Sequence, residues 1–244
     1  MKVLILINKV GLGDCIIHLN YIHEISKKYE KPVSILAKEN TRAKDLFQDD
    51  PHIKEVITLD RLEDETGSHD GLNGFIKLIK DIKEKKFDKV FIFNSSVRYF
   101  LVCKFAGIKK IAQYPLFRKK GQHVVNTAKI FTENEIDKIV STQPKLFVNQ
   151  DKILKAQKKM SFNNKCIVLG ISASGPTKRW EIKNFIKLSE KINQKFPSKF
   201  YLAAGKNDQP LINEISNSNI GSNCVSLNNL KINEMLPIIA NCNL

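Results

Sequence analysis

The pattern of hydrophobic and polar residues predicts alternating strands and helices over the first part of the chain. Short apolar runs such as residues 2–7 (KVLILI) are typical of strands buried on both faces of a parallel sheet. Between such runs, apolar residues recur every three or four positions, as they do in an amphipathic helix. This alternation implies right-handed crossovers and a doubly wound sheet with helices on both faces. The predicted strands are residues 2–7, 32–37, 53–59, 88–94 and 109–114, and the predicted helices are 14–28, 41–48, 75–86 and 97–107.

The same alternation starts again after residues 115–160, where the strand pattern is weak and one helix is expected near 150–160. We therefore expect an α/β protein with two Rossmann-like doubly wound domains, residues 1–160 and 161–244. The second domain is expected to be incomplete, because three strands with their helices are too few to form a covered sheet. Its predicted strands are 166–172, 199–205 and 224–227, and its predicted helices are 183–195, 208–216 and 233–243. In the first domain, residues 63–73 are polar and contain glycine, so they predict a surface loop.

The composition is that of an ordinary globular protein, with 42% hydrophobic and 27% charged residues among 244. No apolar run approaches the length of a membrane span, and the first run is too short for a signal peptide. We therefore expect a cytoplasmic protein. The five cysteines are widely spaced, odd in number and without a C-x-x-C pair, which favours reduced thiols and no structural metal site.

The net charge of +15 raises the question of an anionic partner. Only five of the 40 basic residues are arginine, the residue that best recognises phosphates and base edges through two parallel hydrogen bonds. The charge therefore predicts no nucleic-acid partner. It favours weak attraction to an anionic membrane surface, unless it reflects only a lysine-rich composition.

A glycine-containing turn, NKVGLGDCIIHL, follows the first predicted strand directly. Gly11 and Gly13 match the first two glycines of the dinucleotide-binding motif G-x-G-x-x-G, but Ile16 stands where the third glycine is needed. The acidic residue nearest to the end of the second strand is Glu39. The sequence therefore disfavours a dinucleotide site.

Asp14 lies in the same turn, at the start of a predicted helix. Aspartate is a preferred helix cap, because its side chain accepts hydrogen bonds from the free backbone N–H groups of the first turn. The position also lies beyond the carboxyl end of a strand, where open α/β sheets bind their ligands. Two interpretations therefore remain open at this point: a capping residue and a catalytic carboxylate.

A second loop, GISASGPTKRWEIKNF, follows the strand that opens the second domain. It partly matches the phosphate loop of nucleoside triphosphatases, but Pro176 stands where that loop needs a lysine. Small residues are followed by Lys178, Arg179 and a helix N-terminus, which together offer N–H groups and two cations to an anion. We expect a pyrophosphate site here; the alternative is a solvated loop in which Trp180 only packs.

Three segments resemble glycosyltransferase family 9, the ADP-heptose:lipopolysaccharide heptosyltransferases. KVLILINKVGLGDCIIHLNYI (2–22) is similar to the N-terminal motif of the family, and residues 87–114 are similar to its middle segment. ISASGPTKRWEIKNFIKLSEKI (171–192) is similar to the donor-binding motif. The resemblance covers the chain in family order and implies the GT-B architecture of two Rossmann-like domains.

The resemblance implies an inverting transfer of heptose, or a related sugar, from an ADP-sugar donor to lipopolysaccharide core or a similar lipid-linked glycan. It implies a bacterial enzyme at the cytoplasmic face of the inner membrane, with no cofactor and no obligatory metal. By motif position, Asp14 would be the catalytic base, Lys178 would neutralise the donor diphosphate, and Gly11 and Gly13 would form the acceptor-side loop. The other donor-binding residues would be Ser172, Ser174, Thr177, Arg179 and Asp208.

The chain also departs from the family pattern. After IIANCNL the family continues with a strand, a D-[ST]-G motif that contacts donor phosphate, and further helices. The sequence is therefore expected to be a fragment or a truncated product that binds donor weakly. Two alternatives remain: a non-catalytic nucleotide- or carbohydrate-binding remnant, and another nucleotide-sugar enzyme of the GT-B class.

Overall fold

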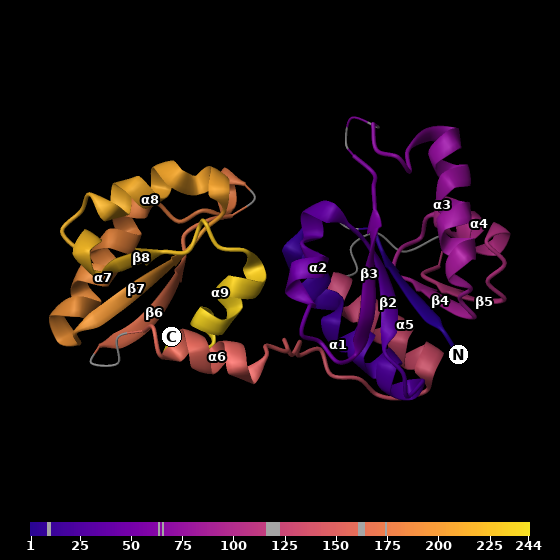
Figure 1. The fold of residues 1–244 in the computed structure, drawn as a ribbon, viewed down its shortest axis with the longest axis horizontal. Coiled ribbons are helices and arrows are strands. Elements are labelled where there is room, and N and C mark those ends of the chain that lie inside the picture. Colours follow the sequence, from indigo (N-terminus) through magenta and orange to yellow (C-terminus); the bar gives the residue numbers. More distant parts are fainter. Residues whose placement is uncertain (9–10, 63, 65, 116–122, 161–163, 174) are drawn as a thin grey trace. The chain divides into compact units, whose positions relative to one another are not determined.

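The computed structural model describes residues 1–8, 11–62, 64, 66–115, 123–160, 164–173 and 175–244. The chain folds into two compact units, unit 1 (Met1–Phe147) and unit 2 (Val148–Leu244) (Figure 1). This division lies before the expected domain boundary at residue 160. The reason is helix α6 (Gln150–Gln157), which packs against helix α9 (Ile232–Ile239) of unit 2.

Unit 1 contains a five-stranded parallel sheet with strand order β3-β2-β1-β4-β5. Strand β1 is central and buried along its whole length, with Ile5 paired to Ile35 on one side and to Phe91 on the other. The described strands confirm the five apolar runs of the sequence, with small differences at their ends. Their bounds are β1 Val3–Ile7, β2 Val33–Lys38, β3 Ile53–Leu59, β4 Lys89–Ile92 and β5 Lys110–Gln113.

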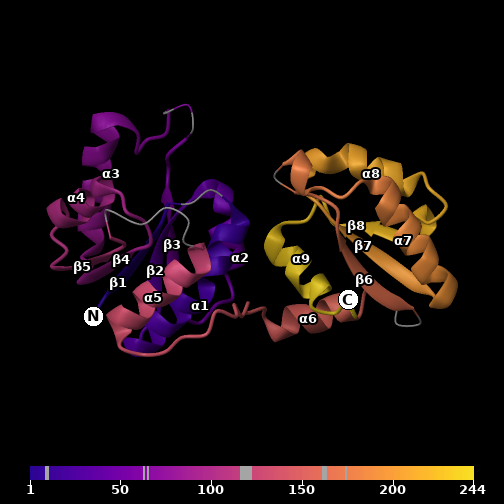
Figure 2. The ribbon, with the colours of Figure 1, turned by 180° about the vertical axis from the view of Figure 1, so that it is seen from behind.

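Helices cover both faces of this sheet because successive strand residues point to opposite sides. In β4, Val90 and Ile92 belong to the core formed with α3 and α4, whereas Phe91 packs edge-on against Phe131 of α5. Figures 1 and 2 show α1 beside α5 and α3 beside α4. The helices are α1 Leu12–Lys28, α2 Ala43–Leu46, α3 Gly71–Lys85, α4 Val97–Phe105 and α5 Val124–Ile136, with a 3₁₀ turn, η1, at Glu39–Thr41.

The structure corrects the prediction of a surface loop at residues 63–73, because α3 begins at Gly71. The residues before it are held by the Asp70 carboxylate, whose side chain is almost fully buried. This carboxylate accepts hydrogen bonds from Arg61 Nε at 2.7 Å and from the backbone N–H groups of Leu62 and Gly67 at 3.0 and 3.1 Å. The Asp70 side chain thus holds the chain segment that leads into α3.

Unit 2 contains the parallel sheet β6-β7-β8. Alternate residues again divide its two faces: Leu169 and Phe200 pack with α7 and α8, whereas Tyr201 packs with α9. The last residues lie along the outer edge of β6, where Asn243 N–H donates to the Cys166 carbonyl. The strands are β6 Lys165–Gly170, β7 Ser198–Ala203 and β8 Cys224–Ser226. The helices are α6, α7 Ile182–Lys195, α8 Gln209–Ser216 and α9, with 3₁₀ turns η2 Pro176–Lys178, η3 Lys206–Asp208 and η4 Gly221–Asn223.

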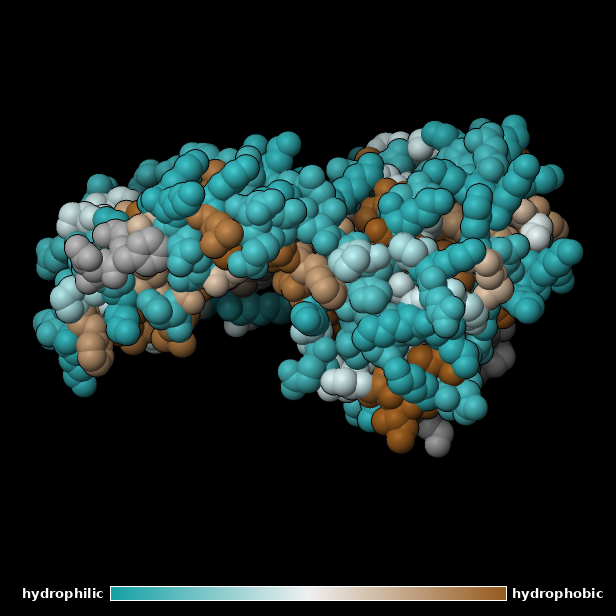
Figure 3. Space-filling view, turned by 60° about the horizontal axis from the view of Figure 1, so that its bottom comes forward, coloured by the Kyte–Doolittle hydropathy of each residue, from teal (hydrophilic) through white to brown (hydrophobic). Residues whose placement is uncertain are grey.

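The surface and the cysteines agree with an ordinary globular protein. Hydrophilic residues cover most of the face shown in Figure 3, and hydrophobic residues gather there in small patches. Within the described ranges, no helix has both the length and the apolar character needed to cross a bilayer. The five cysteines are free thiols, and burial raises the pKa of Cys103 to about 12.

A buried histidine, His23, lies beside the partly exposed His52 in unit 1, near the start of β3. His23 Nε2 is 2.7 Å from Asp50 Oδ2, and both side chains are almost fully buried. The backbone N–H of His52 donates to Asp50 Oδ1 at 2.9 Å, and the rings of His23 and His52 lie 4.8 Å apart. Burial and the neighbouring His23 lower the pKa of His52 below its ordinary value of 6.5.

This pair makes the stability of unit 1 dependent on pH. Because the pKa of His52 is lower in the folded protein than in the unfolded chain, folding releases a proton as the pH falls through 6.5. We expect the free energy of unfolding to be largest above that pH and to decrease between pH 7.5 and 5.5. Urea unfolding at several pH values measures this, and His52→Gln should flatten the dependence. Equal slopes for the two proteins would contradict the assignment.

Candidate functional site

Asp14 lies just beyond the carboxyl end of β1, in the first turn of α1. The helix begins at Leu12 and its N-cap is Gly11, so Asp14 occupies the third helical position. In the part of the chain that the structure describes, no group donates a hydrogen bond to its carboxylate. The capping interpretation is therefore wrong for this side chain, which is half-buried and keeps its oxygens available.

The two glycines before Asp14 have different surroundings. Gly11 has φ +144°, a backbone conformation that L side chains rarely adopt, and a Cβ there would lie 3.6 Å from Asp14 Oδ2. Gly13 is exposed, and a Cβ at this position would meet no atom within 4 Å. The fold of unit 1 thus requires glycine at position 11, whereas the protein itself leaves open space at position 13.

His18 fixes the first turn of α1 against the sheet. Its Nδ1 donates to the backbone carbonyl of Asp14 at 2.6 Å, and its buried ring packs edge-on against Phe93 at 5.0 Å. The sequence reasoning missed His18, although its position four residues after Asp14 places both residues on one helix face.

Cys15 follows Asp14 directly in the same turn. Burial, with a smaller contribution from the charge of Asp14, raises the pKa of Cys15 to about 11.

The second loop runs from the end of β6 to the start of α7 in unit 2, and it is contacted by Asp208, which lies in η3 after β7. The Asp208 carboxylate accepts hydrogen bonds from Ser172 Oγ at 2.5 Å and from Gly205 N–H at 2.9 Å. Arg179 lies 3.5 Å away from its other oxygen. The side chain of Asp208 is 11% exposed. The structure therefore brings together three of the residues assigned to the donor: Ser172, Arg179 and Asp208.

The two cations of this loop differ in their partners. Arg179 donates through Nε to the Ala173 carbonyl at 3.0 Å and also pairs with Asp208. Lys178 is exposed, and none of the described residues forms an ion pair with its ammonium group. Its backbone N–H donates to the Gly175 carbonyl at 3.1 Å, which closes the turn before it. Lys178 is thus the cation of the pair that remains available to an anion.

The other residues expected to bind the donor from this loop are Thr177 and Ser174. Thr177 is exposed, and Ser174 lies outside the described residues. Trp180 is half-exposed and contacts Phe185 edge-on at 5.0 Å. The N-cap of α7 is Glu181, which pairs with Lys183 and whose side chain makes no capping hydrogen bond. The first N–H groups of α7 therefore donate no hydrogen bond to the side chain of the N-cap residue.

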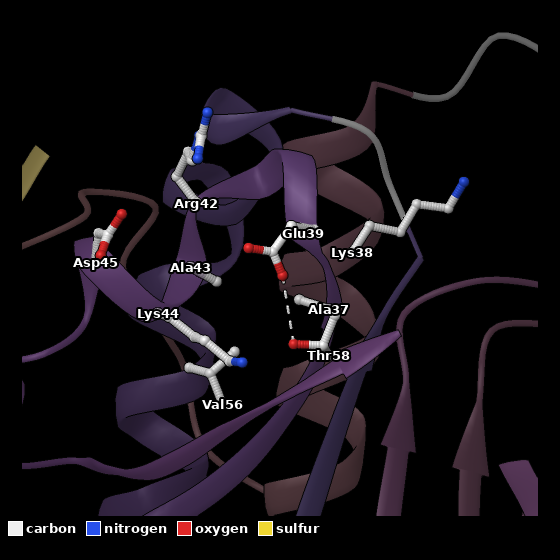
Figure 4. A pocket seen from close by; sticks show the side chains of 9 residues that line it. All are labelled: Ala37, Lys38, Glu39, Arg42, Ala43, Lys44, Asp45, Val56 and Thr58. Carbon is white, nitrogen blue, oxygen red and sulfur yellow. Dashed lines mark hydrogen bonds between the residues drawn. The ribbon is translucent and has the colours of Figure 1, made fainter. Parts of the chain in front are cut away.

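Glu39 lines a small cavity at the carboxyl ends of β2 and β3, where a dinucleotide site would place its ribose. Figure 4 shows Glu39 pointing toward Thr58, whose hydroxyl donates to it at 3.5 Å. The cavity measures about 80 Å³, against about 300–1,000 Å³ for typical small-molecule sites. It is too small for a nucleoside, which agrees with the sequence argument against a dinucleotide site.

A larger cavity of about 630 Å³ lies in unit 2, between α6, α9 and the sheet. None of the residues assigned to the donor from the sequence lines it. The donor loop is therefore a surface loop and not the wall of this cavity.

Among the described residues, no three His, Cys, Asp or Glu side chains lie close enough together to hold a metal ion.

Comparisons with known proteins identify the family of this chain. The model of glycosyltransferase family 9 (heptosyltransferase) matches residues 75–244. A search of curated protein sequences finds no match. The chain is similar in structure to ADP-heptose LPS heptosyltransferase II from E. coli, with TM-score 0.76 and 19% identity over 99% of this chain and 77% of that one.

Two further structures show the same fold at lower identity. A family 9 glycosyltransferase from Veillonella parvula matches with TM-score 0.78 and 15% identity over 100% of this chain and 74% of that one. E. coli heptosyltransferase WaaC, solved with ADP-2-deoxy-2-fluoro heptose, matches with TM-score 0.66 and 10% identity, over 99% and 81%. These similarities confirm the expected GT-B type α/β fold. Because the family model covers more than half of its length, the chain belongs to glycosyltransferase family 9, the heptosyltransferase family.

Proposed function

We propose that this protein transfers heptose, or a closely related sugar, from an ADP-sugar to lipopolysaccharide core or a similar lipid-linked glycan, with inversion at the anomeric carbon. The observation that carries the proposal is the Asp14 carboxylate, which lies beyond the end of β1 and, among the described residues, accepts no hydrogen bond. The solved structure of WaaC with ADP supports an ADP-linked donor.

In this reaction Asp14 acts as the general base on the acceptor hydroxyl. The carboxylate lies in the first turn of α1, beyond the end of β1, where an acceptor hydroxyl can reach it in this proposal. The proton is transferred late, after the acceptor oxygen has begun to bond to the anomeric carbon and has become more acidic. The open space at Gly13 lets the acceptor approach the carboxylate without meeting a side chain.

Lys178 acts on the donor. As the bond between the sugar and the diphosphate breaks, negative charge grows on the leaving group, and a fixed cation lowers the energy of that transition state. The N-terminus of α7, three residues after Lys178, adds N–H groups oriented toward an anion. We propose that these groups replace an obligatory metal ion and that no cofactor takes part.

The acceptor is proposed to reach the protein at the cytoplasmic face of the inner membrane. Support comes from the net charge of +15, which attracts the protein to an anionic lipid surface. Exposed lysines on the outer side of α3, among them Lys77, Lys80 and Lys83, contribute to that charge. The contact is peripheral in this proposal.

Replacing Asp14 by Asn should abolish most of the transfer. Loss of a general base typically lowers a rate by about 100- to 10,000-fold, and Asn keeps the size of the side chain. We expect kcat to fall in this range, while the thermal midpoint and the dissociation constant for ADP stay unchanged. Discontinuous assays of ADP release and calorimetry measure these quantities. Unchanged kcat would show that Asp14 is not the general base, whereas no measurable transfer by the parent protein would favour the non-catalytic remnant.

Gly13→Ala separates function from folding at the same turn. Alanine forms helices better than glycine by up to about 1 kcal/mol, and its methyl group meets no protein atom within 4 Å. We expect equal or higher stability in urea unfolding, together with a raised KM for the acceptor. Gly11→Ala is the matched control, because the φ of +144° predicts a loss of stability instead. Normal acceptor KM in Gly13→Ala would argue against acceptor approach at this point.

Lys178→Ala should remove transition-state stabilisation of the leaving diphosphate. Loss of one such electrostatic contact typically lowers kcat by about 100- to 1,000-fold. We also expect weaker binding of ADP and a smaller effect of salt on that binding. The control is Lys187→Ala, which removes an exposed lysine from the middle of α7. If both variants behave alike, the effect comes from general charge and Lys178 has no specific role.

A further inference from the structure

We propose that Asp208 and Arg179 are positioning residues, which hold the loop after β6 so that Lys178 meets the donor diphosphate, and that neither is itself a donor ligand. The inference rests on the proposed function. It reassigns two residues that the family resemblance places among those that bind the donor.

The contacts of Asp208 argue against a direct role in binding. Its Oδ2 already accepts two hydrogen bonds, from Ser172 Oγ and Gly205 N–H, at 2.5 and 2.9 Å. Its Oδ1 faces the guanidinium of Arg179 at 3.5 Å. Oδ2 thus has no acceptor position left, and a side chain that is only 11% exposed gives a ribose hydroxyl little access to the remaining position on Oδ1.

The Arg179 side chain makes two contacts, one with the backbone of its own loop and one with Asp208. Its Nε donates to the carbonyl of Ala173, and one terminal nitrogen faces Asp208 beyond the end of β7. A planar guanidinium can donate in two fixed directions at once, which a lysine ammonium cannot do in the same geometry. The carboxylate of Asp208 also neutralises much of the charge that Arg179 would offer to a diphosphate.

These contacts anchor the loop on both sides of Lys178. Ser172 is held before the turn and Arg179 directly after Lys178, and both are tied to Asp208. The turn between them is closed by the hydrogen bond from Lys178 N–H to the Gly175 carbonyl at 3.1 Å. The backbone that carries the ammonium group is therefore fixed before any ligand binds. Fixed geometry matters because a misplacement of about 1 Å can lower a rate about 100-fold.

Gly205 provides a way to disturb this arrangement without removing a charge. A Cβ on Gly205 would lie 3.1 Å from Asp208 Oδ2, closer than nearly all such contacts in proteins. Gly205→Ala should therefore shift the carboxylate by a few tenths of an ångström and weaken its hold on Ser172. The backbone of Gly205 has φ −82°, which alanine adopts without strain.

A double-mutant cycle on the dissociation constant for ADP, measured by calorimetry on the full chain, tests the proposal. If Asp208 acts through Lys178, Asp208→Ala weakens ADP binding about tenfold or more, the value of one hydrogen bond to a charged group. In a Lys178→Ala background the same change has less than about a twofold effect, because nothing remains to be positioned. Arg179→Lys behaves like Arg179→Ala, and Gly205→Ala gives a smaller effect in the same direction. If the tenfold effect of Asp208→Ala persists in the Lys178→Ala background, Asp208 binds the donor directly and the proposal is overturned.

Hydrogen exchange without ligand separates this proposal from the proposed function. We expect the peptide that covers residues 171–181 to exchange faster in Asp208→Ala than in the parent protein, while peptides of β6 and β7 exchange equally. Unchanged exchange in the loop peptide would overturn the positioning role even if ADP binds. If the parent protein fails to bind ADP, the proposed donor is wrong, and the exchange result alone decides whether the loop is held as described.

Discussion

The burial of β1 on both faces is the constraint on which the rest of unit 1 depends. A strand without an exposed face needs parallel neighbours on both sides and helices above and below, so each connection crosses from one end of the sheet to the other. All strands then end at the same edge, and the loops that follow them lie there together. Asp14 lies at this edge because it follows the strand that is buried most completely. In unit 2 the loop that carries Lys178 also follows the carboxyl end of a parallel strand, although that strand, β6, lies at the edge of its sheet.

The sequence predicts the strands well because burial on both faces leaves a continuous apolar run that few other structures produce. It predicts α5 poorly, since residues 124–136 mix polar and apolar positions and their packing depends on Phe91 and Phe93 of a distant strand. The contacts that hold the loop before α3 could not be predicted for a related reason. It is held by hydrogen bonds to Asp70 from residues up to nine positions away, which no helical or strand period reveals.

In the candidate site, too, residues within short motifs can be predicted from the sequence, whereas contacts between residues far apart in the sequence cannot. Short motifs are enough to single out Asp14, Gly11 and Lys178 as candidates, because each lies in a turn or near the start of a helix. The partners of Asp208 could not, since Ser172 lies 36 positions away in the sequence and meets it only when β6 and β7 pair. The two aspartates have the same chemistry but different surroundings: among the described residues, nothing occupies the oxygens of Asp14, whereas those of Asp208 are occupied by loop groups.

In the proposed reaction, Asp14 takes the proton from an acceptor oxygen that is already bonding to an electron-poor carbon, because that bond makes the hydroxyl more acidic. That carbon becomes electron-poor when the diphosphate begins to leave, and the departure is promoted by the charge of Lys178. In this proposal, proton transfer to Asp14 depends on how far the diphosphate has departed. A loop that places Lys178 poorly would reduce the effectiveness of Asp14 as well, without any change in unit 1.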